Sequence, residues 1–385
     1  MGKVHPKVDE AIETLNMRDN PTRRRLLAGT GLVSAAGAAS ALLAACSSSS
    51  STHAAVATNG SNPFPAVPNQ KYYFNNHADT NQFFTPTKYG YSDAVALLGL
   101  PAPTWGGSAT SADSEMVSFM NTAISAKAAG IATPVIDSSM ATPVKNAMDA
   151  GIPVVTYNAD GIYTHGVPQI YTNRLAYVGQ ALYLSGQAMG NQIKTLIPGG
   201  GEIVIFIATP GTGNIQPRYD GAVSVLGSSY HVSEVATSTV DGTELSTEKS
   251  YLLGHKGTLK GAFAVDSGST ANLTAALKGT GVSIPAGGFD TDPRTLAGLQ
   301  DGTMKFSIFQ DPYLQGFLPT LYLYLYNLSG AQLAPPDTDT GLTVLTPSNV
   351  ATMLKTSRFQ GGSSAQMYIP RPSGAINQPV GTTST

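Results

Sequence analysis

Residues 151–157 read Gly-Ile-Pro-Val-Val-Thr-Tyr, and this short apolar run, followed directly by Asn158, decides the fold. A β-branched run of this length, bounded by glycine and polar residues, predicts a strand that is buried on both faces. The clearest further strands are predicted at 71–75, 202–207 and 261–265, with one that ends at Asp290 and one at 305–309.

Helical stretches separate these strands. They are rich in small apolar residues and are predicted at 114–129, 141–150, 177–196 and 269–277. Strands that alternate with such helices are typical of parallel sheets whose faces are covered by crossover helices. Residues 321–328 alternate Leu and Tyr, a period that by itself favours a strand. The chain as a whole is predicted to be an α/β protein with doubly wound parallel sheets.

The N-terminal segment carries the pattern of an export signal. The only cysteine of the chain, Cys46, follows Leu-Ala-Ala at 43–45 and a long apolar run, an arrangement that resembles a bacterial lipobox. Upstream, Thr-Arg-Arg-Arg-Leu-Leu at 22–27 resembles a twin-arginine export motif. We therefore expect residues 1–45 to be a lipoprotein signal peptide, and Cys46 to carry a lipid that anchors the protein to the membrane outside the cytoplasm.

Two other interpretations of this segment stay open. The apolar run has about the length that a bilayer core of ~30 Å requires, although its many Gly, Ala and Ser residues make it a weak membrane span. A lone thiol is also commonly a buried apolar filler. Because the chain has one cysteine, disulfides within it and cysteine-rich metal sites are excluded.

Charge excludes one class of function. Residues 1–45 hold six of the 22 Lys and Arg and four of the 24 Asp and Glu, which leaves 16 and 20 in the rest and a formal net charge of −4. A protein of this charge is not a nucleic-acid binder. Charged residues make up 12% of the chain, about half of the usual share of roughly 25%, so neutral polar groups must solvate the surface.

Length and composition also predict the domain organisation. The chain exceeds what one small core serves, and two lobes of roughly 100 to 200 residues each are expected. Residues 46–70 are rich in Ser, Thr, Ala, Asn and Pro without periodicity, and residues 360–385 are similarly rich in Gly, Ser, Pro and Thr. We expect a flexible linker and a disordered tail there.

Polar side chains follow nearly every predicted strand. Ligands of open parallel sheets bind at the carboxyl ends of the strands, so these positions are candidates for a site. The amides and carboxylates found there are Asn81, Asn158, Gln216, Asp266, Asp290 and Gln310. Carboxylates accept hydrogen bonds and amides both donate and accept, which suits a neutral ligand with several hydroxyls. The rings of Phe83 and Phe84 would supply apolar faces for the C–H side of a sugar ring.

The order of these motifs resembles the periplasmic monosaccharide-binding proteins of the ribose and galactose type, which are the soluble receptors of ABC importers. The resemblance covers about residues 71–359. Its motifs are Asn81-x-Phe83-Phe84, Ile-Pro-Val-Val-Thr at 152–156, Arg218-x-x-Gly221, Phe263-Ala264, Gly288-Phe289-Asp290 and Ile308-x-Gln310-x-Pro312. Each motif alone is weak, and their combination is specific.

The resemblance implies ligand contacts for Asn81, Phe83, Phe84, Asn158, Gln216, Asp266, Asp290 and Gln310, and a structural role for Arg218. Ala159 and Gln216 stand where ribose-type receptors have ligand-contacting arginines, Asn158 stands where they have an Asp, and Asp266 replaces an Asn. The missing arginines argue against ribose itself. Another monosaccharide, a polyol or a cyclitol stays compatible with the remaining groups.

Each of these residues has a plainer interpretation as well. Asn and Asp commonly cap the helix that follows a strand, and Phe is commonly a core residue. Trp105, in a loop rich in Pro and Gly, is expected to be a packing plug. His77 is expected to be a bystander near the site.

The resemblance further implies a type I periplasmic-binding-protein fold, in which two doubly wound lobes are joined by a three-segment hinge. The expected first lobe is 71–172 with 311–339, the second is 173–310 with 340–359, and 321–328 becomes a helix. A sugar or polyol bound between the lobes would favour their closure, and an ABC permease would recognise the closed form. A monomer without cofactor or metal is expected.

Three other functions compete with this one. An enzyme would need a nucleophile elbow, a zinc-protease motif, a phosphate loop or a dinucleotide fingerprint, and the chain has none of them. Asp266 and Asp290 could form a glycosidase pair in principle only. A sensory lipoprotein with the same two lobes, signalling to a kinase or chemoreceptor, stays open. A related repressor would need a helix-turn-helix where this chain has its export signal.

Overall fold

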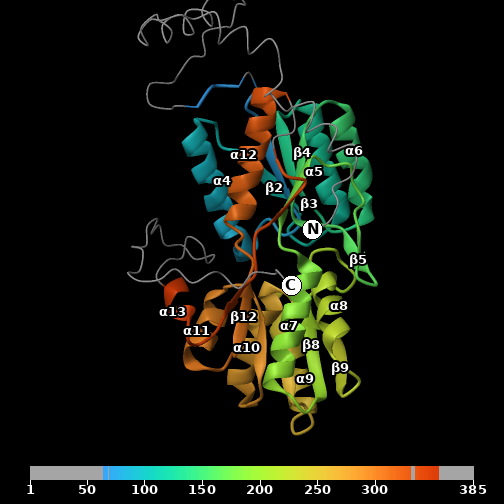
Figure 1. Cartoon of the computed structure of the whole chain (residues 1–385), viewed down its shortest axis with the longest axis vertical. Coiled ribbons are helices and arrows are strands. Elements are labelled where there is room, and N and C mark those ends of the chain that lie inside the picture. Colours follow the sequence, from blue (N-terminus) through green and yellow to red (C-terminus); the bar gives the residue numbers. More distant parts are fainter. Residues whose placement is uncertain (1–63, 68, 331–333, 355–385) are drawn as a thin grey trace, which may run out of the picture. The chain divides into compact units, whose positions relative to one another are not determined.

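The computed structural model describes residues 64–67, 69–330 and 334–354, and Cys46, the predicted signal peptide and the predicted tail lie outside them. The described part forms two α/β lobes, each built on a six-stranded sheet (Figure 1). This confirms the predicted fold class. Among the described residues no helix is both long and apolar enough to span a bilayer.

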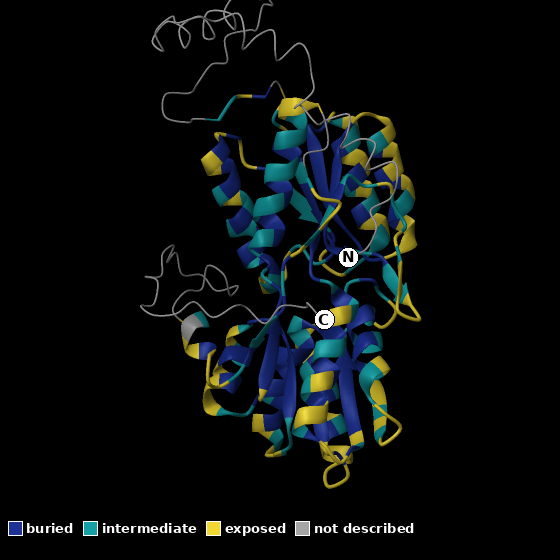
Figure 2. Cartoon of the chain, in the orientation of Figure 1, coloured by how far each residue is buried: buried dark blue, intermediate teal, exposed yellow. Residues whose placement is uncertain are grey.

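The sheet of the first lobe has the strand order β13-β7-β4-β3-β1-β2, and all its pairs are parallel. Its strands are β1 (Tyr72–Asn76), β2 (Thr104–Gly107), β3 (Gly130–Val135), β4 (Val154–Asp160), β7 (Ala176–Gly179) and β13 (Asp337–Asp339). Central strands of a parallel sheet are covered on both faces, which explains why the sequence of β4 is continuously apolar at its start. Figure 2 shows the central strands of both sheets as buried, whereas the edge strands β2, β9 and β13 have no buried residue.

Helices cover both faces of this sheet. On one face α4 (Thr85–Leu98), which follows the short helix η2 (Gln82–Phe84), packs against α12 (Leu314–Ser329). On the other lie α5 (Asp113–Ser125), η3 (Ser138–Met140) and α6 (Ala141–Asp149). The adjacent residues Val154 and Val155 point to opposite faces, so Val154 joins the core under α5 and α6 while Val155 joins the core under α4 and α12.

The second lobe repeats the arrangement. Its sheet has the order β14-β12-β11-β10-β8-β9, in which only the pair of β12 with β14 is antiparallel. The strands are β8 (Gly201–Ile207), β9 (Tyr230–Ala236), β10 (Gly261–Ala264), β11 (Ala286–Phe289), β12 (Phe306–Phe309) and β14 (Thr343–Leu345). The helices are α7 (Leu182–Leu196), α8 (Gln216–Val225), α9 (Asp241–Gly254), α10 (Ser267–Thr280), α11 (Pro293–Asp301) and α13 (Val350–Met353).

The alternation of β8 explains how these helices divide between the two faces. Ile203 and Ile205 join the core that includes residues of α7 and α8, whereas Val204 and Phe206 join the core that includes residues of α9, α10 and α11. Successive side chains of a strand point to opposite faces, and both faces here are covered. In the predicted strand 202–207 the apolar residues 203–207 are therefore buried from both sides, and only Glu202 at its start is exposed.

The chain passes between the two sheets three times, after β7, after β12 and after β13. The first passage differs from the predicted boundary between 172 and 173. Residues Ala176–Gly179 form β7 and pair with β4, so the first lobe continues to Gly179. The same strand shortens the predicted helix 177–196, which begins only at Leu182.

Residues 321–328 belong to α12, as the family resemblance implied and against the period of the sequence. Gly316, Pro319, Thr320 and Leu323 of this helix are buried, and their spacing of three or four residues is helical. Leu323 and Tyr324 are both buried, and the Leu and Tyr residues at 321, 322, 325 and 326 are half-buried, so the alternation carries no information about burial.

Part of the predicted flexible linker packs on the first lobe. Val67 is buried in the core under α12, and the ring of Phe64 meets Tyr324 edge to face at 6.4 Å. The hydroxyl of Tyr324 donates to the carbonyl oxygen of Pro65 at 2.7 Å. These apolar residues cover α12, so residues 64–67 are part of the folded body and the expectation of a linker up to residue 70 is wrong there.

One element had no counterpart in the prediction. The strands β5 (Ile162–Thr164) and β6 (Val167–Gln169) form a two-stranded antiparallel hairpin directly after β4. The ring of Tyr163 stacks on Tyr183 of α7 at 5.1 Å, so the hairpin of the first lobe touches the second.

Helices α7 and α8 approach each other through glycines. A Cβ atom on Gly221 would lie 2.1 Å from the carbonyl oxygen of Tyr183, and one on Gly186 would lie 2.1 Å from that of Arg218. We expect Gly221→Ala to force the helices apart and to lower the free energy of unfolding by about 1 to 3 kcal/mol, measured by urea denaturation. A Cβ atom on Gly242 in α9 would meet no atom of the described residues within 4 Å, so Gly242→Ala is the matched control. Equal losses in both variants would contradict this account of the packing.

Candidate functional site

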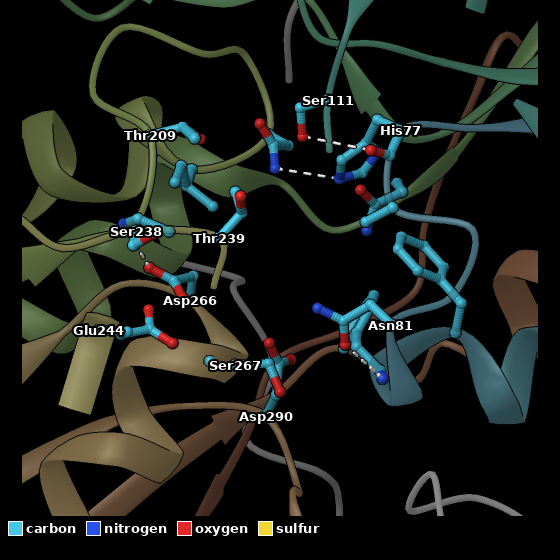
Figure 3. A pocket seen from close by; sticks show the side chains of 18 of the residues that line it. His77, Asn81, Ser111, Thr209, Ser238, Thr239, Glu244, Asp266, Ser267 and Asp290 are labelled. Atoms are coloured by element: carbon cyan, nitrogen blue, oxygen red, sulfur yellow. Dashed lines mark hydrogen bonds between the residues drawn. The ribbon is translucent and has the colours of Figure 1, made fainter. Parts of the chain in front are cut away.

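A cavity of about 190 Å³ lies at the carboxyl ends of the strands of both sheets. Its lining residues come from the segments that follow β1, β2, β8, β9, β10, β11 and β12, and from Asn158 near the end of β4. Figure 3 shows His77 and Asn81 of the first lobe opposite Glu244, Asp266 and Asp290 of the second. Pockets for drug-sized ligands measure roughly 300 to 1,000 Å³, so this cavity suits a smaller molecule.

The structure brings most of the predicted site residues together. The cavity is lined by Asn81, Phe83, Phe84, Asn158, Asp266, Asp290 and Gln310. Gln216 is absent from this lining. Its side chain accepts a hydrogen bond from the backbone of Gly211 at 2.7 Å and donates one to Asp220 at 3.0 Å, which stabilises the start of α8.

Asn81, Phe83 and Phe84 form the wall of the first lobe. The Asn81 side chain accepts a hydrogen bond from the backbone of Phe83 at 2.9 Å and so caps η2, which leaves its amide nitrogen toward the cavity side. The ring of Phe83 meets that of Phe84 edge to face at 4.7 Å. Phe84 is 2% exposed and belongs largely to the core, so Phe83 is the ring that offers a face to a ligand.

Asn158 and Asp290 occupy corresponding places at the ends of β4 and β11, and both are buried. Their φ angles are 65° and 72°, in the left-handed region that Asn and Asp tolerate better than most residues. Such strain persists where the surroundings hold it, and it gathers at binding sites. The amide of Asn158 donates to Gln315 at 3.2 Å, while Asp290 accepts from Gln310 at 2.9 Å.

Asp266 combines a structural role with its place on the cavity wall. Its carboxylate accepts hydrogen bonds from the backbone of Ser269 at 2.9 Å and of Ala208 at 3.0 Å, and it also accepts from the hydroxyl of Ser269. It therefore caps α10 and ties the loop after β8 to it. A ligand would meet a carboxylate whose position is already fixed.

Arg218 is the buried cation of this wall. Its guanidinium donates to the carbonyl oxygen of Val265 at 3.0 Å and to Gln180 at 3.1 Å, and it lies 4.3 Å from the centre of the Phe289 ring. Burial lowers its pKa, whereas Asp290 and Asp266 raise it. Arg218 also lines the cavity, and its buried Nε has no hydrogen-bond partner among the described residues, so the structural role that the resemblance implied stays a prediction.

Burial dominates the electrostatics of the carboxylates. It raises the pKa of Asp290 to about 6, against the opposing effects of Arg218 and of the Gln310 hydrogen bond. It raises the pKa of Glu244 to about 7, with a further contribution from the charge of Asp266. The cavity therefore gains negative charge as the pH rises through neutrality.

His77 was expected to be a bystander near the site, but the structure places it in the cavity wall. It is 5% exposed, lines the cavity, and meets Asn214 of the second lobe at 3.2 Å between Nε2 and Nδ2. Burial lowers its pKa to about 4, so the ring is neutral at neutral pH. Trp105 donates to the carbonyl oxygen of Asp79 at 3.0 Å and packs on Phe74, as expected for a packing residue.

Several lining residues were not predicted, among them Thr209, Asn214, Ser238, Thr239 and Glu244. Ser238 and Thr239 follow β9. This edge strand has several exposed side chains and therefore no apolar run that would predict it. Had β9 been recognised, the rule for strand ends would have indicated both. Glu244 follows no strand directly and comes from the first turn of α9, so no such signal existed for it.

The described residues contain no cluster of three or more His, Cys, Asp or Glu side chains that could hold a metal ion. What they contain is a ring of amides, carboxylates and hydroxyls with one aromatic face, built from strand ends of two α/β lobes. This combination defines a two-lobed receptor for a small polar molecule.

The comparisons with known proteins agree. The model of the family described as periplasmic binding protein domain matches residues 72–330. The chain is 44% identical over 316 residues to the xylose/arabinose-binding protein XylF of Sulfolobus acidocaldarius, with 78% of this chain and 77% of the relative covered. The chain therefore belongs to the periplasmic sugar-binding protein family, as its motifs predicted, and its relatives are binding proteins rather than enzymes.

Solved structures share the fold. A solute-binding protein of an ABC transporter from Burkholderia graminis in complex with D-arabinose has a TM-score of 0.66 at 24% identity, covering 74% of this chain and 98% of that one. A carbohydrate transporter protein from Acidothermus cellulolyticus in complex with myo-inositol has a TM-score of 0.67 at 21% identity, covering 76% and 99%.

Proposed function

We propose that this protein captures a monosaccharide or polyol in the cavity between its lobes and delivers it to an ABC permease. The observation that carries the proposal is the cavity wall itself, where Asn81 of the first lobe lies opposite Asp266 and Asp290 of the second (Figure 3) and Phe83 and Gln310 also line the cavity. A ligand held by both walls gains contacts only when the lobes are together, so binding favours closure and gives the permease a form to recognise.

Among sugars, we propose that aldopentoses are the first candidates. The 44% identical relative is a xylose/arabinose-binding protein, and the small volume of the cavity favours a five-carbon sugar or a compact polyol. The polar groups are amides and carboxylates, which bind neutral hydroxyls. The ligand contacts that we propose are Asn81, Phe83, Asn158, Asp266, Asp290 and Gln310.

A thermal-shift screen tests the function. Residues 53–360 would be screened against pentoses, hexoses, deoxysugars, polyols and inositols, because a ligand of the native state raises the melting temperature. We expect the largest shifts with D-xylose and L-arabinose, confirmed by calorimetry. Protection by no sugar or polyol of the panel would contradict the proposal.

The pKa of Asp290 predicts how affinity depends on pH. Ligand hydroxyls donate to the ionised carboxylate, and its pKa of about 6 in the free protein means that acid removes this acceptor. By proton linkage we expect sugar affinity to be about tenfold weaker at pH 5 than at pH 7. Calorimetric titrations at a series of pH values measure this.

Asp290→Asn is the matched variant, because Asn tolerates the left-handed backbone and its Oδ1 still accepts from Gln310. Its affinity should be lower at pH 7 and nearly independent of pH. If Asp290→Asn lost as much sugar affinity between pH 7 and pH 5 as the wild type does, another group, such as Glu244, would cause the pH dependence, and the role of Asp290 would be contradicted.

We also propose that the protein is exported by the twin-arginine route and held at the membrane by a lipid on Cys46. The lipobox-like sequence around this cysteine supports the proposal, together with membership of an extracytoplasmic family. Cys46→Ser should release the protein into the soluble fraction of the producing cells, and mass spectrometry of the wild type should find the lipid. Retention of the variant in the membrane fraction would overturn the anchor.

A further inference from the structure

Four buried side chains form a continuous hydrogen-bonded chain from the first lobe to the second, here called the amide relay. Asn158 Nδ2 donates to Gln315 Oε1 at 3.2 Å, Gln315 Nε2 donates to Gln310 Oε1 at 3.1 Å, and Gln310 Nε2 donates to Asp290 Oδ1 at 2.9 Å. These residues are between 0% and 5% exposed. Gln315 lies at the start of α12, just past the second passage of the chain between the lobes, and does not line the cavity.

The chemistry of the amide relay fixes its direction. An ionised carboxylate only accepts, so Gln310 must turn its NH₂ group to Asp290 and its oxygen to Gln315. Gln315 must then donate to Gln310 and accept from Asn158. The charge of Asp290 fixes the orientation of the Gln310 amide. Gln310 in turn fixes the orientation of Gln315, and Gln315 that of Asn158.

Thr340 sets the same direction independently. Its hydroxyl donates to the carbonyl oxygen of Gln310 at 2.6 Å, so toward Gln315 its oxygen can only accept. Gln315 Nε2 donates to this oxygen at 3.2 Å and to the carbonyl oxygen of Gln310 at 3.3 Å. Every acceptor around Gln315 Nε2 thus requires the same orientation of the amide.

The ends of the amide relay face the cavity. Because Asn158 is anchored through its NH₂ group, its Oδ1 is left for the cavity, and within the described residues this atom has no hydrogen-bond partner. Oδ2 of Asp290 likewise has none. The relay therefore presents an acceptor on each side of the site.

We propose that Gln315 is a positioning residue that fixes the hydrogen-bond polarity of the site, so that a bound sugar must donate one hydroxyl hydrogen to Asn158 and one to Asp290. This inference rests on the proposed function for its ligand class. The site should accept polyhydroxy compounds with both hydroxyls free and reject derivatives in which fluorine replaces either one, because fluorine cannot donate.

The test uses D-xylose and L-arabinose with their monodeoxyfluoro derivatives, titrated by calorimetry. For the wild type we expect fluorine to weaken binding by about tenfold or more at the two ring positions whose hydroxyls donate to Asn158 and Asp290, as loss of a hydrogen bond to a buried group does. In Gln315→Met the Asn158 amide is free to turn its NH₂ group to the ligand. The penalty at one of these positions should fall to about threefold or less, while the penalty at the Asp290 position stays.

Asn327→Leu is the matched control. Asn327 is an amide of the same helix that donates to Tyr72 at 3.1 Å and to the carbonyl oxygen of Ala129 at 2.9 Å, away from the cavity. This variant should lose stability and keep the selectivity of the wild type. Wild-type selectivity in Gln315→Met, or a wild type that binds all fluoro derivatives as well as the parent sugars, would overturn the proposal.

A measurement without ligand separates this inference from the proposed function. The side-chain NH₂ protons of Asn158 are followed by nitrogen-15 NMR in the free protein, and their exchange with solvent should be slow in the wild type and in Asn327→Leu and faster in Gln315→Met. If the exchange rate in Gln315→Met equalled that of the wild type, the amide relay would be overturned, whichever ligand the protein binds. The expected exchange pattern in a protein that binds no sugar would support the relay and contradict the proposed ligand class.

Discussion

Replacement of Glu248 by methionine should stabilise the protein at pH 8 by about 3 to 5 kcal/mol. Glu248 lies in α9 with no exposed surface, and in the described part of the chain neither oxygen of its carboxyl group has a hydrogen-bond partner. Burial, aided by the charges of Glu244 and Asp266, raises its pKa from 4.5 to about 10 against the opposing effect of Arg294. Methionine is similar in size, has no charge and has no group that needs a partner.

The pH dependence follows from the direction of this shift. The pKa is higher in the folded state than in the unfolded state, so the folded protein holds a proton that the unfolded chain releases. Its contribution to stability is complete below pH 4.5 and is lost progressively as the pH rises toward 10. The melting temperature of the wild type should therefore fall across this range, and that of Glu248→Met should fall less.

Denaturant melts at a series of pH values measure both effects. Glu248→Gln removes the charge and keeps a polar group, so it should flatten the pH dependence with a smaller gain in stability. Glu202→Gln, at an exposed carboxylate of β8, is the control and should change stability by less than about 0.5 kcal/mol. If Glu248→Met were less stable than the wild type at pH 8, the carboxyl group would have a favourable partner that this account lacks.

The fold could be predicted from the sequence wherever the burial of an element produces a recognisable pattern of apolar residues. Strands such as β4 and β8 are buried on both faces, so their sequences are continuously apolar and easy to recognise. The strand β7 is short, and its Ala-Tyr-Val-Gly sequence is followed almost directly by α7. The sequence therefore did not reveal the strand, and the first passage between the lobes was predicted too early. The hairpin of β5 and β6 is partly exposed, and its short strands carry no apolar run.

The candidate site also contains residues that the sequence could predict and residues that it could not. Asn158, Asp290 and Gln310 were predicted because they come at the ends of strands that the sequence reveals, and Asn81 and Phe83 because they lie in the polar segment after the first predicted strand. Gln216 was predicted from the segment that follows the strand at 202–207 and from the family resemblance, but its side chain accepts from the backbone of Gly211 in the turn before α8. Gln315 and Glu244 could not be predicted, since each acts from within a helix and depends on contacts that only the tertiary structure creates.

Replacement of Arg218 by methionine should lower the free energy of unfolding by about 3 to 5 kcal/mol, as loss of one partner from a buried charged network does. Asp266 and Asp290 would lose the cation that opposes their burial, and the carbonyl oxygen of Val265 would lose its donor. Arg218→Lys keeps the charge but cannot make both of the bonds to Val265 and Gln180, so an intermediate loss is expected. Lys145→Met, at an exposed cation paired with Asp149, should cost less than about 1 kcal/mol.

The effect of Arg218→Met on ligand binding distinguishes its electrostatic role from simple packing. Because the guanidinium lowers the pKa of Asp290, its removal should move that pKa upward from about 6. The pH below which sugar affinity declines should then rise in Arg218→Met and stay near the wild-type value in Arg218→Lys, as calorimetry across pH would measure. A destabilised Arg218→Met with an unchanged midpoint would mean that the guanidinium supports only the packing of α8. A raised midpoint would show that one buried cation both holds this lobe together and keeps its binding carboxylate ionised.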